Sequence, residues 1–255
     1  MTSHPQHRGS LHNQLLGALA LDIRERIAPH LEHVPLKIGE VVCEAGMQLR
    51  HAYFPEGCVL SLLTLLDNGD AIETANIGRE GAFGLFSAMY SRSSFNRCIV
   101  QLRGNALRCK IDILREEFEK SESMRNLFVS YSETLLSQAQ QSVACNAVHT
   151  VREKLCRWLL MMDDRAGGEN LSFTHEFLSQ ILGVNRKTIT LAARAMQKAG
   201  LIEYERGTIQ VLDRHGLEQG SCECYEAVNA RFTAFLSPPK TAVQESAEVA
   251  MRRIN

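Results

Sequence analysis

The chain has 255 residues, of which 45% are hydrophobic and 22% are charged. This length favours two domains, and the composition is too apolar for a disordered chain. The net charge is −1, so a surface that binds nucleic acid would have to be a local feature. No apolar run approaches the ~18–20 residues of a membrane span, and the polar N-terminus lacks the pattern of a secretory signal. The eight cysteines are therefore expected to be reduced thiols, mostly in the core of a cytoplasmic protein.

The first half of the chain changes from helical to strand-like periodicity. Apolar residues recur every four positions from Leu11 to Ile27 and predict a helix over 11–33. The segment Asp67-Asn68-Gly69-Asp70 favours a tight hairpin, because Asn-Gly tolerates positive φ. Several short strands with close turns predict an antiparallel roll, sandwich or barrel. The expected strands are Lys37–Glu44, His51–Phe54, Val59–Leu66, Ala71–Ile77, Asn96–Leu102 and Ala106–Lys110.

Helices follow the strands. A short helix is expected over 112–119, and residues 122–148 contain neither Gly nor Pro and predict one long helix. Its apolar residues have an imperfect heptad spacing, which is compatible either with packing on the roll or with a dimer seam. The seam candidates are Met124, Phe128, Tyr131, Leu135 and Ser142. A further helix is expected over 150–164.

Residues 171–212 follow the plan of a helix-turn-helix with a wing. Thr174 is a good N-cap for a short helix, and Gly183 supplies the sharp turn that follows it. Asn185 then caps a second helix that runs to about Ala199. After that helix, 202–204 and 208–212 predict a two-stranded wing with Arg206 at its tip.

The second helix, about 185–199, is predicted to have a cationic face. It contains no acidic residue, although the chain as a whole is nearly neutral. At 100° per residue, its polar side chains fall within an arc of about 120° and would suit a DNA major groove. These side chains are Arg186, Lys187, Thr190, Arg194, Gln197 and Lys198, and the inward face is expected to carry Ile189, Ala192, Met196 and Ala199.

The stretch THEFLSQILGVNRKTI, residues 174–189, resembles the winged helix-turn-helix of the Crp/Fnr family of bacterial transcription regulators. The resemblance extends over roughly 12–230. It implies an α+β fold with an N-terminal antiparallel β-roll (a double-stranded β-helix or jelly-roll-like domain), a long dimerisation helix and a C-terminal winged helix-turn-helix. The expected boundaries are 12–120 for a cyclic-nucleotide-binding-like sensor domain, 121–149 for the dimerisation helix, 150–236 for the DNA-binding domain and 237–255 for a tail of uncertain order.

The resemblance also implies residue roles at the DNA. Arg186 matches a guanine-reading arginine, whose planar fork fits guanine O6 and N7. Lys187 departs from the glutamate of well-known members, and Leu191 stands where a second base-reading arginine often lies, so the target sequence should differ. The full set expected at DNA is Thr174, Asn185, Arg186, Lys187, Thr188, Thr190, Arg194, Lys198 and Arg206.

The motifs that hold an effector in this family are altered here. Members that bind cyclic AMP use Gly-Glu-Leu and Arg-Ser-Ala elements, whereas Leu85 stands in the glutamate position and Arg97 is displaced by one residue. Cyclic AMP in the usual pose is therefore not expected, and the effector is unknown. No cysteine cluster of the iron-sulfur branch is present, and nothing supports haem. Cys222 and Cys224 would lie on opposite faces of a helix, so no metal site is expected.

The leading interpretation is a homodimeric transcription regulator that binds double-stranded DNA at an inverted-repeat operator and contacts RNA polymerase. The alternative is a ligand-sensing module whose winged helix contacts protein rather than DNA. An enzyme is not expected, because phosphate-binding glycine loops, zinc-binding HExxH helices and nucleophile elbows are all missing from the sequence.

Overall fold

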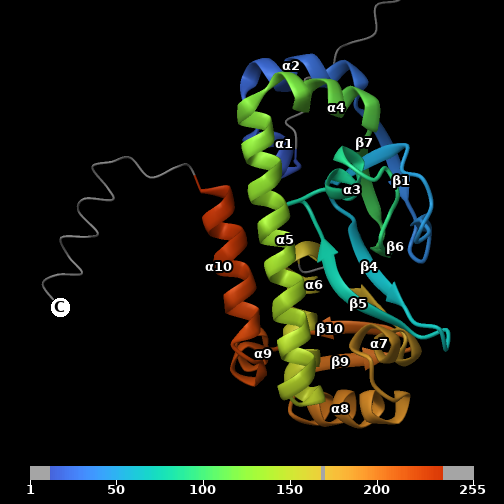
Figure 1. Cartoon of the computed structure of the whole chain (residues 1–255). Helices are drawn as coiled ribbons and strands as arrows, with labels where there is room; N and C mark the ends of the chain where they lie inside the picture. The colour runs from blue at the N-terminus through green and yellow to red at the C-terminus, as the bar shows by residue number, and fades with distance from the viewer. Residues whose placement is uncertain (1–11, 168–169, 238–255) are drawn as a thin grey trace, which may run out of the picture.

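A computed structural model describes residues 12–167 and 170–237 (Figure 1). An antiparallel roll precedes a long helix, and a winged helix-turn-helix follows it. The predicted α+β class with this order of parts is confirmed. None of the described helices combines the length and the apolar character that crossing a membrane requires. The predictions for Leu11 and for the tail beyond Ser237 lie outside the described residues.

The N-terminal segment forms two short helices rather than the single predicted helix over 11–33. Helix α1 (Gln14–Ala18) and helix α2 (Leu21–Ile27) are followed by the 3₁₀ turn η1 (Ala28–His30), and residues 32–36 are a strand. The chain becomes extended at Leu19, where the backbone ψ is 147°. Leu15, Leu19, Ile23 and Ile27 are all buried, so the described part of the predicted stripe is inside although the helix is interrupted.

The roll consists of two antiparallel sheets. One sheet has the order β1-β7-β3, and the other has the order β2-β6-β4-β5. Strands β4 and β5 form the predicted hairpin, in which Leu65 pairs with Ala71 and Gly69 has a φ of 87°. The bounds are β1 (Glu32–Leu36), β2 (Val41–Cys43), β3 (His51–Pro55), β4 (Val59–Leu65), β5 (Ala71–Ile77), β6 (Arg97–Leu102) and β7 (Gly104–Lys110), with the short helix α3 (Leu85–Met89) before β6.

Helix α5 (Glu122–Val148) follows α4 (Ile111–Lys120) and runs along most of the molecule beside the roll (Figure 1). Its end-points agree with the prediction from the sequence. The hydroxyl of Tyr131 lies 3.0 Å from both the backbone N and the backbone O of Ala82, which ties the helix to the roll. A Cβ on Gly81 would lie within 2.4 Å of that hydroxyl, so the close approach requires glycine.

The buried face of α5 belongs to the core of its own protomer. Met124, Phe128 and Tyr131 are at most 3% exposed, Ser142 is also buried, and Leu135 is half-buried. They pack within the chain, mainly because α1, α10 and the roll cover this side of the helix. The side chains predicted for a dimer seam are thus packed mostly inside the protomer, and the exposed apolar side chains of α5 lie on another face of the helix.

The C-terminal part begins with α6 (Val151–Ala166), whose start is a complete capping box between Thr150 and Glu153. A three-stranded sheet with the order β8-β10-β9 forms the wing. Cys222 precedes the last helix instead of lying in it, so the predicted opposition of Cys222 and Cys224 across a helix is wrong. The bounds are β8 (Leu171–Ser172), α7 (His175–Leu182), α8 (Arg186–Lys198), β9 (Ile202–Glu205), β10 (Thr208–Val211), α9 (Arg214–Gly220) and α10 (Cys224–Leu236).

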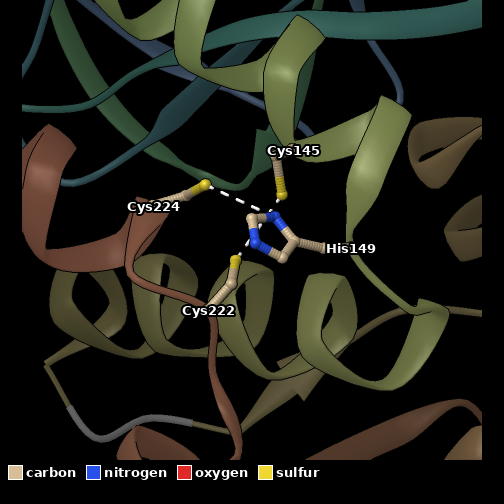
Figure 2. Close-up of side chains that lie close together, drawn as sticks. All are labelled: Cys145, His149, Cys222 and Cys224. Carbon is tan, nitrogen blue, oxygen red and sulfur yellow. Dashed lines mark hydrogen bonds between the residues drawn. The ribbon is translucent and has the colours of Figure 1, made fainter.

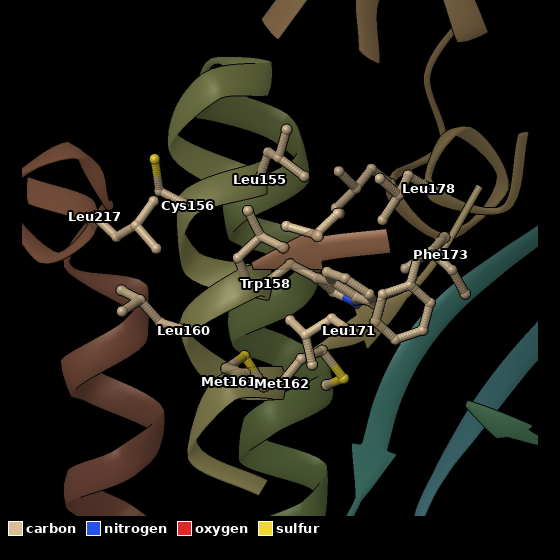
Figure 3. Close-up of a cluster of buried hydrophobic side chains, with 14 of the residues drawn as sticks. Leu155, Cys156, Trp158, Leu160, Met161, Met162, Leu171, Phe173, Leu178 and Leu217 are labelled. Carbon is tan, nitrogen blue, oxygen red and sulfur yellow. The ribbon is translucent and has the colours of Figure 1, made fainter. Parts of the chain in front are cut away.

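The roll and the winged helix share one hydrophobic core around Trp158 of α6 (Figure 3). Val59 and Leu63 of the roll belong to the same cluster. The indole is 1% exposed and makes an edge-to-face contact with Phe173, with ring centroids 4.7 Å apart. Its Nε1 donates a hydrogen bond of 3.2 Å to the buried carboxylate of Glu73 on β5. The two parts are therefore joined by packing and by a buried polar contact.

A second polar contact crosses the same junction. Arg165 of α6 donates hydrogen bonds from Nε (3.2 Å) and Nη2 to the Glu80 carboxylate, which also accepts from the Gly78 backbone N–H. Burial by itself would raise the pKa of Glu80, but the Arg165 guanidinium and these hydrogen bonds hold it below its ordinary value. The carboxyl is therefore ionised at neutral pH, and the ion pair stabilises the docked arrangement.

We predict that Arg165→Gln lowers the free energy of unfolding by about 3 kcal/mol, because it leaves the Glu80 carboxylate buried without its cation. The matched control is Arg97→Gln, which removes an exposed pair with Glu44 and should cost less than about 1 kcal/mol. Urea denaturation at neutral pH measures both. Equal losses in the two variants would contradict the structural role of the Glu80–Arg165 pair.

The loss of stability in Arg165→Gln should depend on pH. Because the folded-state pKa of Glu80 is lowered, the stability from this pair is present above the ordinary carboxyl pKa of about 4.3. It is lost as the pH falls through the folded-state value. The stability difference between the native chain and Arg165→Gln should therefore narrow in acid.

Candidate nucleic-acid interface

Helices α7 and α8 are joined by a turn that the local sequence specifies. The Thr174 side chain accepts a hydrogen bond from the backbone N of Phe177 and begins α7. Gly183 ends α7 with a φ of 61°, and Asn185 then accepts a hydrogen bond of 2.7 Å from the backbone N of Lys187 to begin α8. The predicted caps and turn are confirmed, and they fix the angle between the two helices.

Helix α8 lies at one end of the molecule, opposite α2 and α4 (Figure 1). Six residues predicted to contact DNA are exposed along it and at its cap: Asn185, Arg186, Lys187, Thr188, Arg194 and, in the last turn, Lys198. Leu191 is also 67% exposed.

The buried face of α8 carries Ile189, Ala193 and Met196, whereas the predicted Ala192 is half-buried and Ala199 is exposed. The helix is thus rotated slightly from the expected orientation, and its cationic face stays outside.

Thr190 differs from its predicted neighbours because it is half-buried. Its hydroxyl donates to the Arg186 carbonyl over 3.0 Å and lies 3.0 Å from His175 Nδ1. The imidazole stacks on the Tyr204 ring of the wing, with centroids 4.4 Å apart. Burial, together with the charges of Arg186 and Arg194, lowers the pKa of His175, so the ring is neutral at neutral pH. These three side chains brace α8 against α7 and the wing, a role that the sequence analysis did not assign.

The wing places one arginine at its tip. Arg206 and Gly207 have φ values of 50° and 83° and link β9 to β10 in a two-residue turn. The Arg206 side chain is 91% exposed and lies 3.5 Å from Glu205. Arg186 has a similar exposed contact with Glu176 at 4.0 Å. Such exposed ion pairs contribute little stability, so both guanidinium groups can exchange a carboxylate for another anion at small cost.

The roll contains a cavity of about 220 Å³ against α5, at the place where the altered effector motifs meet the helix. Apolar side chains such as Leu62, Ile77, Phe83 and Phe95 line much of it. None of the described side chains along it is charged. Leu85 is 2% exposed and packs in a different core cluster, and Arg97 pairs with Glu44.

Comparison with known proteins supports the assignment of the C-terminal part. Residues 153–219 match the family model of the Crp-like helix-turn-helix domain. No curated protein matches the chain.

Solved structures with the same overall fold cover most of the chain. A protein from Eubacterium rectale, described as a transcriptional regulator of the Crp/Fnr family, is 21% identical with a TM-score of 0.65, and the match covers 80% of this chain and 96% of that one. FixK2 from Bradyrhizobium japonicum is 15% identical with a TM-score of 0.64, covering 75% and 98%. The c-di-GMP-responsive regulator CLP from Xanthomonas campestris is 15% identical with a TM-score of 0.60, covering 75% and 99%.

At these identities the structural likeness establishes the fold, and the family model establishes the helix-turn-helix. Residues 153–219 are therefore a Crp-like helix-turn-helix domain, carried by a chain that has the fold of the Crp/Fnr transcription regulators.

Proposed function

We propose that this protein is a homodimeric, sequence-specific DNA-binding transcription regulator. The observation that carries the proposal is the exposed, acid-free surface of α8, held at a fixed angle by the capped turn at Gly183. Arg186 at its start is long enough to reach the edge of a guanine, and Lys187, Arg194 and Lys198 can contact phosphates on either side of a groove. Arg206 of the wing would contact the backbone beside it.

We place the dimer seam on the exposed face of α5. Val129, Leu136 and Val143 are 54%, 58% and 68% exposed and are spaced by seven residues. A seven-residue apolar repeat on one helix is the pattern that packs against an identical helix. This assignment replaces the seam inferred from the sequence, whose side chains are buried in the protomer. Two recognition helices related by a two-fold axis would enter grooves about 34–36 Å apart, so the operator should be an inverted repeat.

The roll cavity is the proposed effector site. Without a charged side chain among its described lining residues, the cavity offers no cation to a cyclic phosphate, and the same reasoning applies to the c-di-GMP to which CLP responds. A small, mostly apolar ligand suits it better. Leu136 lines the cavity and also belongs to the proposed dimer seam, so an occupant would act directly on that seam.

Contact with RNA polymerase stays a prediction.

Arg186 and Lys198 should affect DNA binding in different ways. Arg186→Ala is expected to cost about 1–3 kcal/mol of discrimination at one base pair in each half-site. Lys198→Ala should weaken binding to all sequences alike and reduce the slope of log affinity against log salt by about 1. Electrophoretic mobility and fluorescence anisotropy on a selected operator and its single-base variants measure both effects. Identical behaviour of the two variants, or retention that does not depend on salt, would favour the alternative in which the winged helix contacts protein.

Val143→Glu is expected to convert the dimer to a monomer, because it places a charge within the apolar seam, at its C-terminal end. Ser130→Glu is the matched control, since it adds the same charge to an exposed position of α5 about 140° away from Val143 around the helix. Sedimentation equilibrium gives the mass of each variant, and circular dichroism checks the fold. A dimer that survives Val143→Glu would place the seam elsewhere.

A further inference from the structure

Three cysteines and a histidine from distant parts of the sequence meet at the lower end of α5. Cys145 lies in the last turn of α5, and His149 follows as its C-cap residue. Cys222 lies in the connection between α9 and α10, and Cys224 is the first residue of α10. Figure 2 shows the three sulfur atoms and the imidazole gathered in one place. One potential ligand atom from each residue lies within 4.8 Å of the other three.

The separations fit four ligands around a single ion. The Cys145 and Cys222 sulfur atoms are 3.6 Å apart, and Cys224 Sγ is 3.6 Å from His149 Nδ1. With Zn–S near ~2.3 Å and Zn–N near ~2.05 Å, a tetrahedral ion sets its ligands about 3.6–3.8 Å apart. A disulfide would need its sulfur atoms at about 2.05 Å, and all three cysteines are free.

The surroundings also suit a metal ion. The three sulfur atoms belong to residues that are at most 5% exposed, so solvent does not compete for the site. His149 directs Nδ1 toward the cysteines and has Nε2 3.2 Å from the Glu223 carboxylate. A carboxylate on the remote nitrogen of a ligating imidazole fixes its orientation and tautomer. Gln141 Nε2 donates to Cys224 Sγ over 3.0 Å, which stabilises a thiolate.

The local charge balance favours a divalent ion. Three thiolates and one Zn²⁺ carry a net charge of −1. Arg157 of α6 is 6% exposed, and its charge acts on Cys145. Within the described part of the chain, Arg157 Nε has no hydrogen-bond partner. A buried guanidinium nitrogen without a hydrogen-bond partner is costly, and a net negative metal centre would add to the compensation that the Glu73 carboxyl gives this cation.

We propose that Cys145, His149, Cys222 and Cys224 bind one Zn²⁺ per protomer in a closed tetrahedral site. A Cys₃His set with four protein ligands and no open position is typical of structural zinc. The compact spacing favours one ion over an iron-sulfur cluster, because a cluster places its own sulfide ions between the ligands. The thiols lose their protons when the ion binds, so zinc binding releases protons to solvent.

At this location the ion would have a structural role. It would join the end of α5, just before the turn into α6, to the segment that leads into α10. On the proposed function, this is where the dimer helix passes into the DNA-binding domain, and the ion would hold that junction. The binding of zinc itself does not depend on the proposed function.

The test uses the full-length chain without a metal-binding tag, purified under reducing conditions and stripped with a chelator. Co²⁺ is then titrated in the absence of DNA. We expect one Co²⁺ per protomer, with the intense visible bands of a tetrahedral site and thiolate-to-cobalt charge transfer, and displacement by one equivalent of Zn²⁺. Failure of the unmodified chain to bind stoichiometric Co²⁺ or Zn²⁺ overturns the site, whatever the DNA assay gives.

Variants then assign the ligands. Cys224→Ser should weaken Zn²⁺ binding more than about 100-fold, and Glu223→Gln, which changes the partner of His149 Nε2, by about 10- to 100-fold. Cys109→Ser is the matched control, because Cys109 is 1% exposed in β7 and lies outside the cluster. Unchanged affinity in Cys224→Ser, acid-labile sulfide with bound iron, or a Cys145–Cys222 disulfide in the metal-free native protein would each refute the zinc assignment.

Discussion

The shared core around Trp158 is the constraint on which the rest of this structure depends. Its indole packs with residues of both the roll and the winged helix, and its N–H reaches the Glu73 carboxylate of the roll. Burial raises the pKa of the Glu73 carboxyl, and the hydrogen bonds that it accepts from Ser61 and Gln101 oppose that rise. The Arg165–Glu80 pair crosses the same junction. The recognition surface is therefore held in a defined position relative to the roll.

Helix α5 connects the parts of the molecule through its different faces. One face is buried against the roll and α10, and another lines the roll cavity. The exposed face carries the repeat of Val129, Leu136 and Val143, and the last turn presents Cys145 to the proposed zinc site. A change in the cavity, at the seam or at the metal would thus act on the same rigid element. This arrangement gives the proposed effector a physical route to the spacing of two recognition helices.

The electrostatics of the winged helix depend on local rather than global charge. A chain with a net charge of −1 attracts DNA only through a surface such as α8, from which carboxylates are absent. His175 does not add to this charge, because burial and the neighbouring arginines lower its pKa. It contributes instead by stacking on Tyr204 and contacting Thr190, and these contacts hold α8 in place against the wing.

The sequence determined the features that depend on neighbours along the chain. These are strands β2 to β7 and the Asn68-Gly69 hairpin of the roll, the bounds of α5, the caps at Thr174 and Asn185, and the wing turn, because each follows from backbone preferences and short-range hydrogen bonds. Tertiary structure decided which face of each element is buried. Periodicity alone could not show that α10 and the roll cover Met124, Phe128 and Tyr131, that the first helix breaks at Leu19, or that Thr190 turns toward His175. The meeting of Cys145 and His149 with Cys222 and Cys224 depends on segments more than 70 residues apart, and only the packing of α10 against α5 brings them together.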